Sequence, residues 1–187
     1  MSRTDQNERQ FLVQKIVSGG QTGVDRGALD AAIAVGIEHG GWCPLGRVAE
    51  DGVIPADYRL REAESADYPV RTERNIADSD GTLILFHSRL FGGTDLTRRL
   101  AVKLGKPYLL VNIAETPDPS SVAPWLQENQ IRVLNVAGPR ESNCPGICQM
   151  AFAFVRRLLS EPTALHLDPE SAKRYIAGLP GTPRAGL

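Results

Sequence analysis

The chain has 187 residues, of which 42% are hydrophobic and 23% are charged, and its formal net charge is -1. These values are typical of a soluble globular protein of one domain, and they argue against a chain built as a whole for nucleic acid or anionic membranes. No stretch approaches the roughly 18 consecutive apolar residues of a membrane span. The polar start MSRTDQNERQ lacks a signal peptide's apolar core, and three cysteines are too few for a disulfide scaffold, so we expect a cytoplasmic protein.

The first half of the chain begins with a short strand and a helix. A strand is predicted over Lys15–Ser18, and Gly19-Gly20 leads from it into a helix over Arg26–Val35. The next stretch, residues 39–58, is rich in glycine and proline and is predicted to be a long connection. Its interspersed large apolar residues favour an ordered loop.

From Arg71 onward, strands and helices alternate with short connections. The apolar run GTLILF (81–86) is typical of a strand buried on both faces of a parallel sheet. The other expected elements are a helix over Arg71–Ser79, a glycine-led helix within 91–107, a strand over 108–112, a helix over 119–130, a strand over 131–138 and a loop and helix over 139–159. This order predicts a single α/β domain, a three-layer Rossmann-like fold with a mostly parallel sheet.

The domain boundaries follow from composition. Residues 1–13 form a polar N-terminal extension, and residues 14–160 form the ligand-binding domain. Residues 161–187 are a tail richer in proline and glycine. In it, Asp168 and Pro169 suit the start of one short helix and Gly178 suits its end.

Three loops, 18–25, 91–97 and 137–142, each leave the end of a predicted strand and enter a helix. In a parallel sheet such loops share one edge, where helix N-termini attract anions and glycine permits close approach. We therefore predict a cradle for phosphate or a similar anion, which Gly20→Trp is expected to fill. The alternative for the first loop is a simple helix start, because Thr22-x-x-Asp25 has the spacing of a capping box. The candidate ligand-binding residues are Gly19, Gly20, Gln21, Thr22, Gly23, Asp25, Arg26, Gly92, Gly93, Thr94, Asp95, Gly138, Arg140, Glu141 and Ser142.

Arginines surround these loops and suit phosphate, because a guanidinium can hold it with two hydrogen bonds. Arg140 lies within a loop and is the better candidate, whereas Arg98 and Arg99 could simply solvate an outer helical face. Arg71 and Arg74 begin a helix that could face the loops.

Other reactive side chains indicate no catalytic or metal site. Glu50-Asp51 is interpreted as a pair of exposed acids, and His87 has no carboxylate partner identifiable by spacing. Cys144 and Cys148 have no second pair with metal-ligand spacing, so no metal site is expected.

Several motifs in order carry a resemblance to a known family. They are KIVSGGQTGVDRGALDAAIAVG, GWCPLGRVAEDGVIPADYRL, YPVRTERNIADSDGTLILF, FGGTDLT and NVAGPRES. Together, over about residues 14–159, they resemble the molybdenum carrier family, a branch of the Rossmann-like group that includes the lysine-decarboxylase-like phosphoribohydrolases. The resemblance implies a protein that binds and protects molybdenum cofactor, a phosphorylated molybdopterin, as a homodimer or homotetramer, with molybdoenzymes as recipients.

The hydrolase relatives carry P-G-G-x-G-T-x-x-E with a catalytic glutamate. Aligned on the glycine pair, this chain has Phe91 at the proline and Arg99 at the glutamate. The resemblance therefore implies a non-catalytic carrier. The alternative is a nucleotide-binding enzyme of the phosphoribohydrolase type, in which Asp25 or Asp95 supplies the acid and a nucleoside monophosphate is the substrate.

Overall fold

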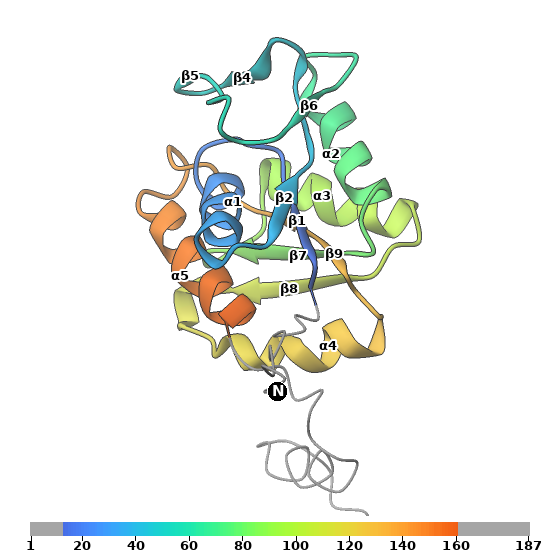
Figure 1. Ribbon diagram of the computed structural model, residues 1–187, viewed down its shortest axis with the longest axis vertical. Coiled ribbons are helices and arrows are strands. Elements are labelled where there is room, and N and C mark those ends of the chain that lie inside the picture. The colour runs from blue at the N-terminus through green and yellow to red at the C-terminus, as the bar shows by residue number, and fades with distance from the viewer. Residues whose placement is uncertain (1–12, 161–187) are drawn as a thin grey trace, which may run out of the picture. The chain divides into compact units, whose positions relative to one another are not determined.

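A central sheet of five parallel strands forms the middle of the structure (Figure 1). The computed structural model describes residues 13–160, so the predicted N-terminal extension and tail helix lie outside the described residues. The strands are β1 (Lys15–Val17), β2 (Glu38–Gly40), β7 (Gly81–Phe86), β8 (Tyr108–Asn112) and β9 (Val133–Ala137), in the order β2-β1-β9-β7-β8. The predicted α/β fold with a parallel sheet is confirmed.

Helices cover both faces of this sheet. They are α1 (Val24–Val35), α2 (Tyr68–Ala77), α3 (Gly92–Lys103), α4 (Ala123–Glu128) and α5 (Ile147–Ser160). Helix α1 packs on α5, and α2 packs on α3 (Figure 1). Because parallel crossovers are right-handed, the strand order puts α1 and α4 on one face and α2 and α3 on the other, and α5 joins the first face by packing on α1. The result is the predicted three-layer arrangement.

The core follows the strongest local signals in the sequence. In β7, Leu83, Ile84 and Leu85 are fully buried, as expected for an apolar run between two helical layers. Helices α1 and α5 approach each other closely at Gly27, where a Cβ atom would lie 2.4 Å from the carbonyl oxygen of Cys148. Glycine is therefore required at this helix crossing.

Some element boundaries differ from those predicted. Helix α2 starts at Tyr68 instead of Arg71, because Pro69 suits the first turn of a helix. The helix predicted over 119–130 is a 3₁₀ turn, Pro119–Val122, followed by the short α4. Strand β2 lies partly in the segment predicted to be a loop. A second 3₁₀ turn, Ile113–Glu115, follows β8.

The long connection is ordered, as predicted, and Figure 1 shows it as a separate lobe above the helices. It contains the parallel pair β3 (Trp42–Cys43) and β6 (Arg61–Glu62), the antiparallel pair β4 (Val48–Ala49) and β5 (Gly52–Val53), and a 3₁₀ turn, Leu45–Arg47. A small core of Cys43, Ala49 and Ile54 lies inside it. The Arg47 guanidinium donates to the carbonyls of Ile54, Pro55, Tyr58 and Leu60 at 2.8 to 3.2 Å, which fixes the chain around that core.

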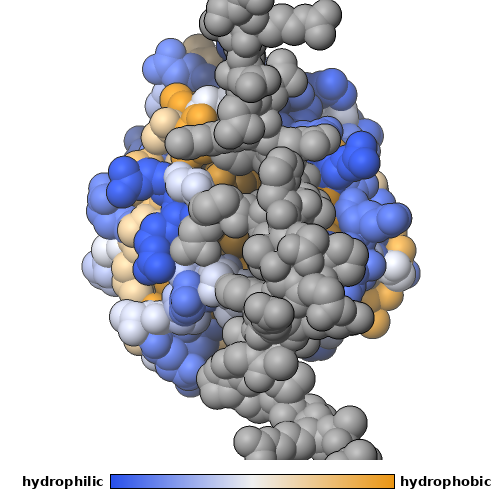
Figure 2. Space-filling model, turned by 60° about the horizontal axis from the view of Figure 1, so that its bottom comes forward, coloured by the Kyte–Doolittle hydropathy of each residue, from blue (hydrophilic) through white to orange (hydrophobic). Residues whose placement is uncertain are grey.

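The surface carries isolated apolar side chains, such as Val53 and Val102. On the face shown in Figure 2, hydrophobic groups are small and separated by hydrophilic side chains wherever the atoms are coloured. Within residues 13–160, no helix combines the length and apolar character needed to cross a bilayer.

Candidate ligand-binding site

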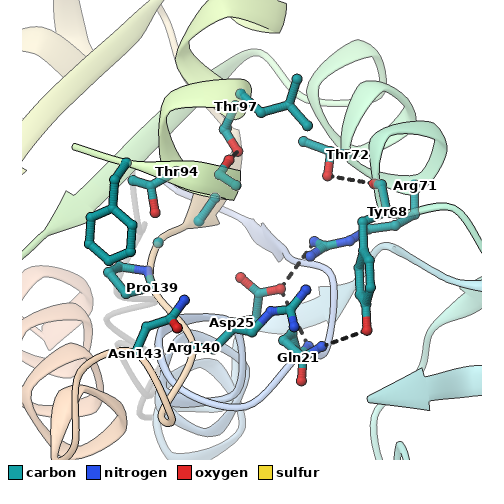
Figure 3. Close-up of a pocket in the computed structure, with 15 residues that line it drawn as sticks. Gln21, Asp25, Tyr68, Arg71, Thr72, Thr94, Thr97, Pro139, Arg140 and Asn143 are labelled. Carbon is teal, nitrogen blue, oxygen red and sulfur yellow. Dashed lines mark hydrogen bonds and ion pairs between the residues drawn. The ribbon is translucent and has the colours of Figure 1, made fainter. Parts of the chain in front are cut away.

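A cavity of about 140 Å³ opens at the carboxyl edge of the sheet (Figure 3). The three glycine-containing loops predicted to share an edge follow β1, β7 and β9, which are neighbours in the sheet. Residues of all three loops line the cavity, and the first turn of α2 closes it on the remaining side. The sheet order thus brings together segments that are far apart in the sequence.

A buried ion pair forms the floor of the cavity. The Arg71 Nη1 atom lies 3.1 Å from Asp25 Oδ2, and the two side chains are only 13% and 4% exposed. The backbone N–H of Gln21 donates to the same carboxylate oxygen at 3.3 Å. Burial raises the pKa of Asp25, and the nearby Arg71 guanidinium only partly offsets this effect.

Gly19 makes room for this pair. A Cβ atom at position 19 would lie 1.6 Å from Arg71 Nη1, so the guanidinium occupies the space that a side chain there would need. The Arg71 Nε atom is buried and has no hydrogen-bond partner among the described residues. Arg71, noted from the sequence as a residue that could face the loops, lines the cavity. Arg74 instead pairs with Glu64.

The wall beside the ion pair is aromatic and cationic. The Arg140 guanidinium lies 4.5 Å from the centre of the Tyr68 ring, and the Arg71 guanidinium lies 5.8 Å from it. The Gln21 amide donates to the Tyr68 hydroxyl at 3.1 Å, which holds the ring in place. None of the ion pairs found in residues 13–160 involves Arg140, whose charge acts on Glu50 only at longer range.

Opposite this wall, α3 presents an open N-terminus. Its N-cap, Phe91, provides no side-chain hydrogen bond, and a Cβ atom on Gly92 or Gly93 would meet nothing within 4 Å. Thr94 and Thr97 lie on the cavity side, and the Thr97 hydroxyl donates to the Gly93 carbonyl at 3.0 Å. Free N–H groups and the helix dipole make this end suitable for an anion.

The other two predicted anion loops are closed by protein atoms. The Val24 N–H at the start of α1 donates to the Pro139 carbonyl at 3.1 Å. A Cβ atom on Gly23 would lie 2.4 Å from that same oxygen, so Gly23 serves the contact between the two loops. At the start of α5, the Glu141 carboxylate accepts from the N–H groups of Gly146 and Cys148 at 2.5 and 3.0 Å. Glu141 therefore caps a helix.

The acids interpreted as an exposed pair, Glu50-Asp51, fasten the long connection to these loops. The Glu50 carboxylate accepts from the hydroxyls of Thr22 and Ser142 and from the Ser142 N–H at 3.2 Å. Partial burial works against the charge of Glu50, but these hydrogen bonds outweigh it and lower the pKa. Asp51 holds Arg26 through two hydrogen bonds of 2.5 and 2.8 Å.

Several candidate residues consequently lie outside the cavity. Thr22, Arg26, Glu141 and Ser142 make the contacts just described. Thr22 does not form a capping box, because the N-cap of α1 is Gly23 and no side chain caps that helix.

Asp95 and Gly20 also lie outside the lining of the cavity. Asp95 pairs with Arg98 and Arg99 on α3 at 3.0 and 3.1 Å. These arginines therefore lie on an outer face of the helix, which was the alternative considered for them. Gly20 has a φ of +75°, and its Cβ would meet Leu60 and Ile54 beneath the long connection. The expectation that Gly20→Trp fills the cradle is therefore wrong.

The sequence matches the model of the circularly permuted YpsA SLOG family over residues 16–159. The chain belongs to this family. A crystal structure entitled "putative molybdenum carrier protein", from Syntrophus aciditrophicus SB, is similar to it at 43% sequence identity and a TM-score of 0.76. That match covers 80% of this chain and 97% of the other. No curated protein matches the sequence significantly. The resemblance to molybdenum carrier proteins is thus confirmed.

In this member of the YpsA SLOG family, some cavity residues carry no recognisable sequence signal. Tyr68 and Asn143 line the cavity, yet neither belongs to a glycine-rich stretch or a charged cluster. Phe91 also lines it and lies in the predicted loop 91–97, but it was not among the candidate residues. Tyr68 precedes Pro69 at the start of a helix. This pattern predicts the helix start but does not indicate that the Tyr68 ring lines a cavity. Of the predicted residues, Gln21, Asp25, Gly93, Thr94, Gly138 and Arg140 line it.

Proposed function

We propose that this protein binds and protects molybdenum cofactor, as a non-catalytic carrier or storage protein. The observation that carries the proposal is a cavity with the open N-terminus of α3 on one side and the Arg140 guanidinium, stacked on Tyr68, on the other. Both groups suit the phosphate of a phosphorylated molybdopterin. The name of the similar Syntrophus protein supports the same cargo.

The size of the cavity suggests which part of the cargo it takes. About 140 Å³ is below the range of roughly 300–1,000 Å³ typical of pockets that enclose a whole small molecule. We infer that the phosphate enters, held by the N–H groups of Gly92 and Gly93, the Thr94 hydroxyl and Arg140. The pterin would extend outward past Phe91, a residue that is 41% exposed.

The absence of turnover is also part of the proposal. Arg99, at the position of the hydrolases' glutamate, pairs with Asp95 and is 62% exposed. This position therefore supplies no carboxylate, and its side chain does not line the cavity.

The second candidate is an enzyme that acts on a nucleoside monophosphate. The buried Asp25 lines the same cavity as the anion-binding groups, which favours this alternative, whereas Asp95 lies outside the cavity. Release of adenine from AMP, abolished in Asp25→Asn, would establish the enzyme.

The decisive experiment is an equilibrium titration of the full chain with molybdenum cofactor, with AMP as competitor. Saturable binding that AMP does not displace would support the carrier. Arg140→Ala should weaken this binding about tenfold or more, since it removes a charged hydrogen-bond donor. The matched control, Arg98→Ala, removes an arginine already paired with Asp95 and should change little. No binding, or easy displacement by AMP, would refute the carrier.

We further propose a homodimer or homotetramer in the cytoplasm, with molybdoenzymes as recipients. Cys43, Cys144 and Cys148 are all free thiols, as is usual in a reducing compartment. Light scattering would test the assembly, and cofactor transfer to an apo-molybdoenzyme would test the delivery.

A further inference from the structure

The cavity contains one group that does not suit a simple anion site. The Asp25 carboxylate lines the same small space as Arg140 and Thr94, although a carboxylate repels a bare oxyanion. Phosphate monoesters differ from sulfate and molybdate in this respect. They have a second pKa of about 6 and can carry a P–OH proton near neutrality, whereas sulfate and molybdate are then fully ionised and have no proton to donate.

The geometry of Asp25 leaves one acceptor for such a proton. The Gln21 N–H and the Arg71 guanidinium both bond to Oδ2. Figure 3 shows the other carboxylate oxygen pointing into the cavity, and the hydrogen bonds found for the Asp25 carboxylate within residues 13–160 all use Oδ2. The nearby Ser18 hydroxyl donates to the Val136 carbonyl at 2.6 Å, so its proton is not available to Asp25.

Burial raises the pKa of Asp25, and Arg71 opposes this effect by stabilising the ionised carboxylate. Its Nη1 atom lies 3.1 Å from Oδ2, and a guanidinium keeps its proton at every physiological pH. Neutralising Asp25 would leave a buried cation without a counter-charge, which is unfavourable. The free oxygen is therefore an acceptor facing a site for negative charge.

We propose that Asp25 makes this cavity selective for oxyanions that carry a proton, so that it accepts a phosphate monoester and rejects molybdate and sulfate. Through the proposed function, on which this inference rests, the cavity then holds the phosphorylated end of the cargo and not its oxo-molybdenum end. A carboxylate that accepts P–OH loses that hydrogen bond with sulfate and gains a repulsion. Arg140 and the α3 N-terminus attract both kinds of anion.

The first test uses the unmodified full chain. Its affinities for inorganic phosphate, sulfate and molybdate are measured by calorimetry at one ionic strength and neutral pH. Phenyl phosphate and phenyl sulfate form a second pair that differs only in the anionic group. We expect each phosphate probe to bind about tenfold or more tightly than its competitors, the effect of a hydrogen bond to a charged group.

The second test is Asp25→Asn, which replaces an acceptor with an amide that can also donate. The preference should shrink or reverse, with sulfate and molybdate gaining about tenfold relative to phosphate. Asp51→Asn makes the same chemical change at a carboxylate paired with Arg26 outside the cavity, and should keep the wild-type preference. If Asp25→Asn does not fold, the two ligand series measured on the unmodified chain still test whether the cavity prefers phosphate.

The outcomes separate this inference from the proposed function. Equal affinity of the unmodified chain for phosphate and sulfate overturns the role of Asp25 and leaves cofactor binding intact. A preference that Asp25→Asn leaves unchanged also overturns it. If no oxyanion probe binds, the inference fails, while the cofactor titration decides the proposed function independently.

Discussion

Enlarging Gly93 should block the cavity without harming the fold. Gly93 lies in the first turn of α3 and lines the cavity, its φ is not in the left-handed region, and a Cβ there would meet nothing within 4 Å. In Gly93→Phe the ring would occupy much of a space of about 140 Å³. We expect cofactor affinity to fall about 100-fold or more, which corresponds to about 2.8 kcal/mol.

The folded state of Gly93→Phe should be slightly more stable than that of the unmodified chain. Replacing glycine in a helix gains up to about 1 kcal/mol, less near a terminus. For a chain of this size, about 1 kcal/mol raises Tm by about 2–4 °C. Titration and thermal unfolding are measured together, and Val102→Phe, on the exposed side of α3, is the control for added bulk. Unchanged cofactor affinity in a folded Gly93→Phe would refute the location of the site.

Three further predictions concern stability. Arg71→Gln leaves the buried Asp25 without its cation and should cost about 3–5 kcal/mol in urea unfolding; an unchanged midpoint would contradict the ion pair. Gly27→Ala places a Cβ 2.4 Å from the Cys148 carbonyl and should cost about 1–3 kcal/mol, whereas Gly93→Ala, also in a helix, should not destabilise. The hydrogen bonds to Glu50 lower its folded pKa, so its contribution is fully present above the unfolded value of 4.5 and is lost as pH falls through the folded pKa. Glu50→Gln should therefore lower Tm at neutral pH, and its difference from the unmodified chain should shrink in acid; a constant difference would contradict the role of the charge.

The sheet was predictable where the signal is local. GTLILF is apolar at nearly every position because β7 is covered on both faces, and its identification needed no knowledge of its neighbours. Strand β2 has no such signal, since its three residues include the exposed Glu38. It exists because it pairs with β1, and a pairing between distant segments cannot be deduced from either segment alone.

The site was predictable only in part, for a related reason. Glycine after a strand correctly indicated the edge of the sheet, but it did not reveal which loop remains open. Gly23 and Gly93 look equivalent in sequence, yet the first meets the Pro139 carbonyl and the second meets open space. Glu50 likewise looked like an ordinary exposed acid, because its partners Thr22 and Ser142 come from two other loops.

The contacts that remove residues from the cavity also explain how the cavity keeps its shape. The loops after β1 and β9 hold each other through the Val24–Pro139 hydrogen bond, and Glu50 bridges Thr22 of one to Ser142 of the other. Ordering flexible loops around a ligand costs binding energy, and loops fixed beforehand avoid that cost. With these two loops closed by protein atoms, the N-terminus of α3 is left as the element whose N–H groups would meet the anion under the proposed function. This division of roles accounts for three glycine-containing loops at one edge of the sheet when a single anion needs only one open helix end.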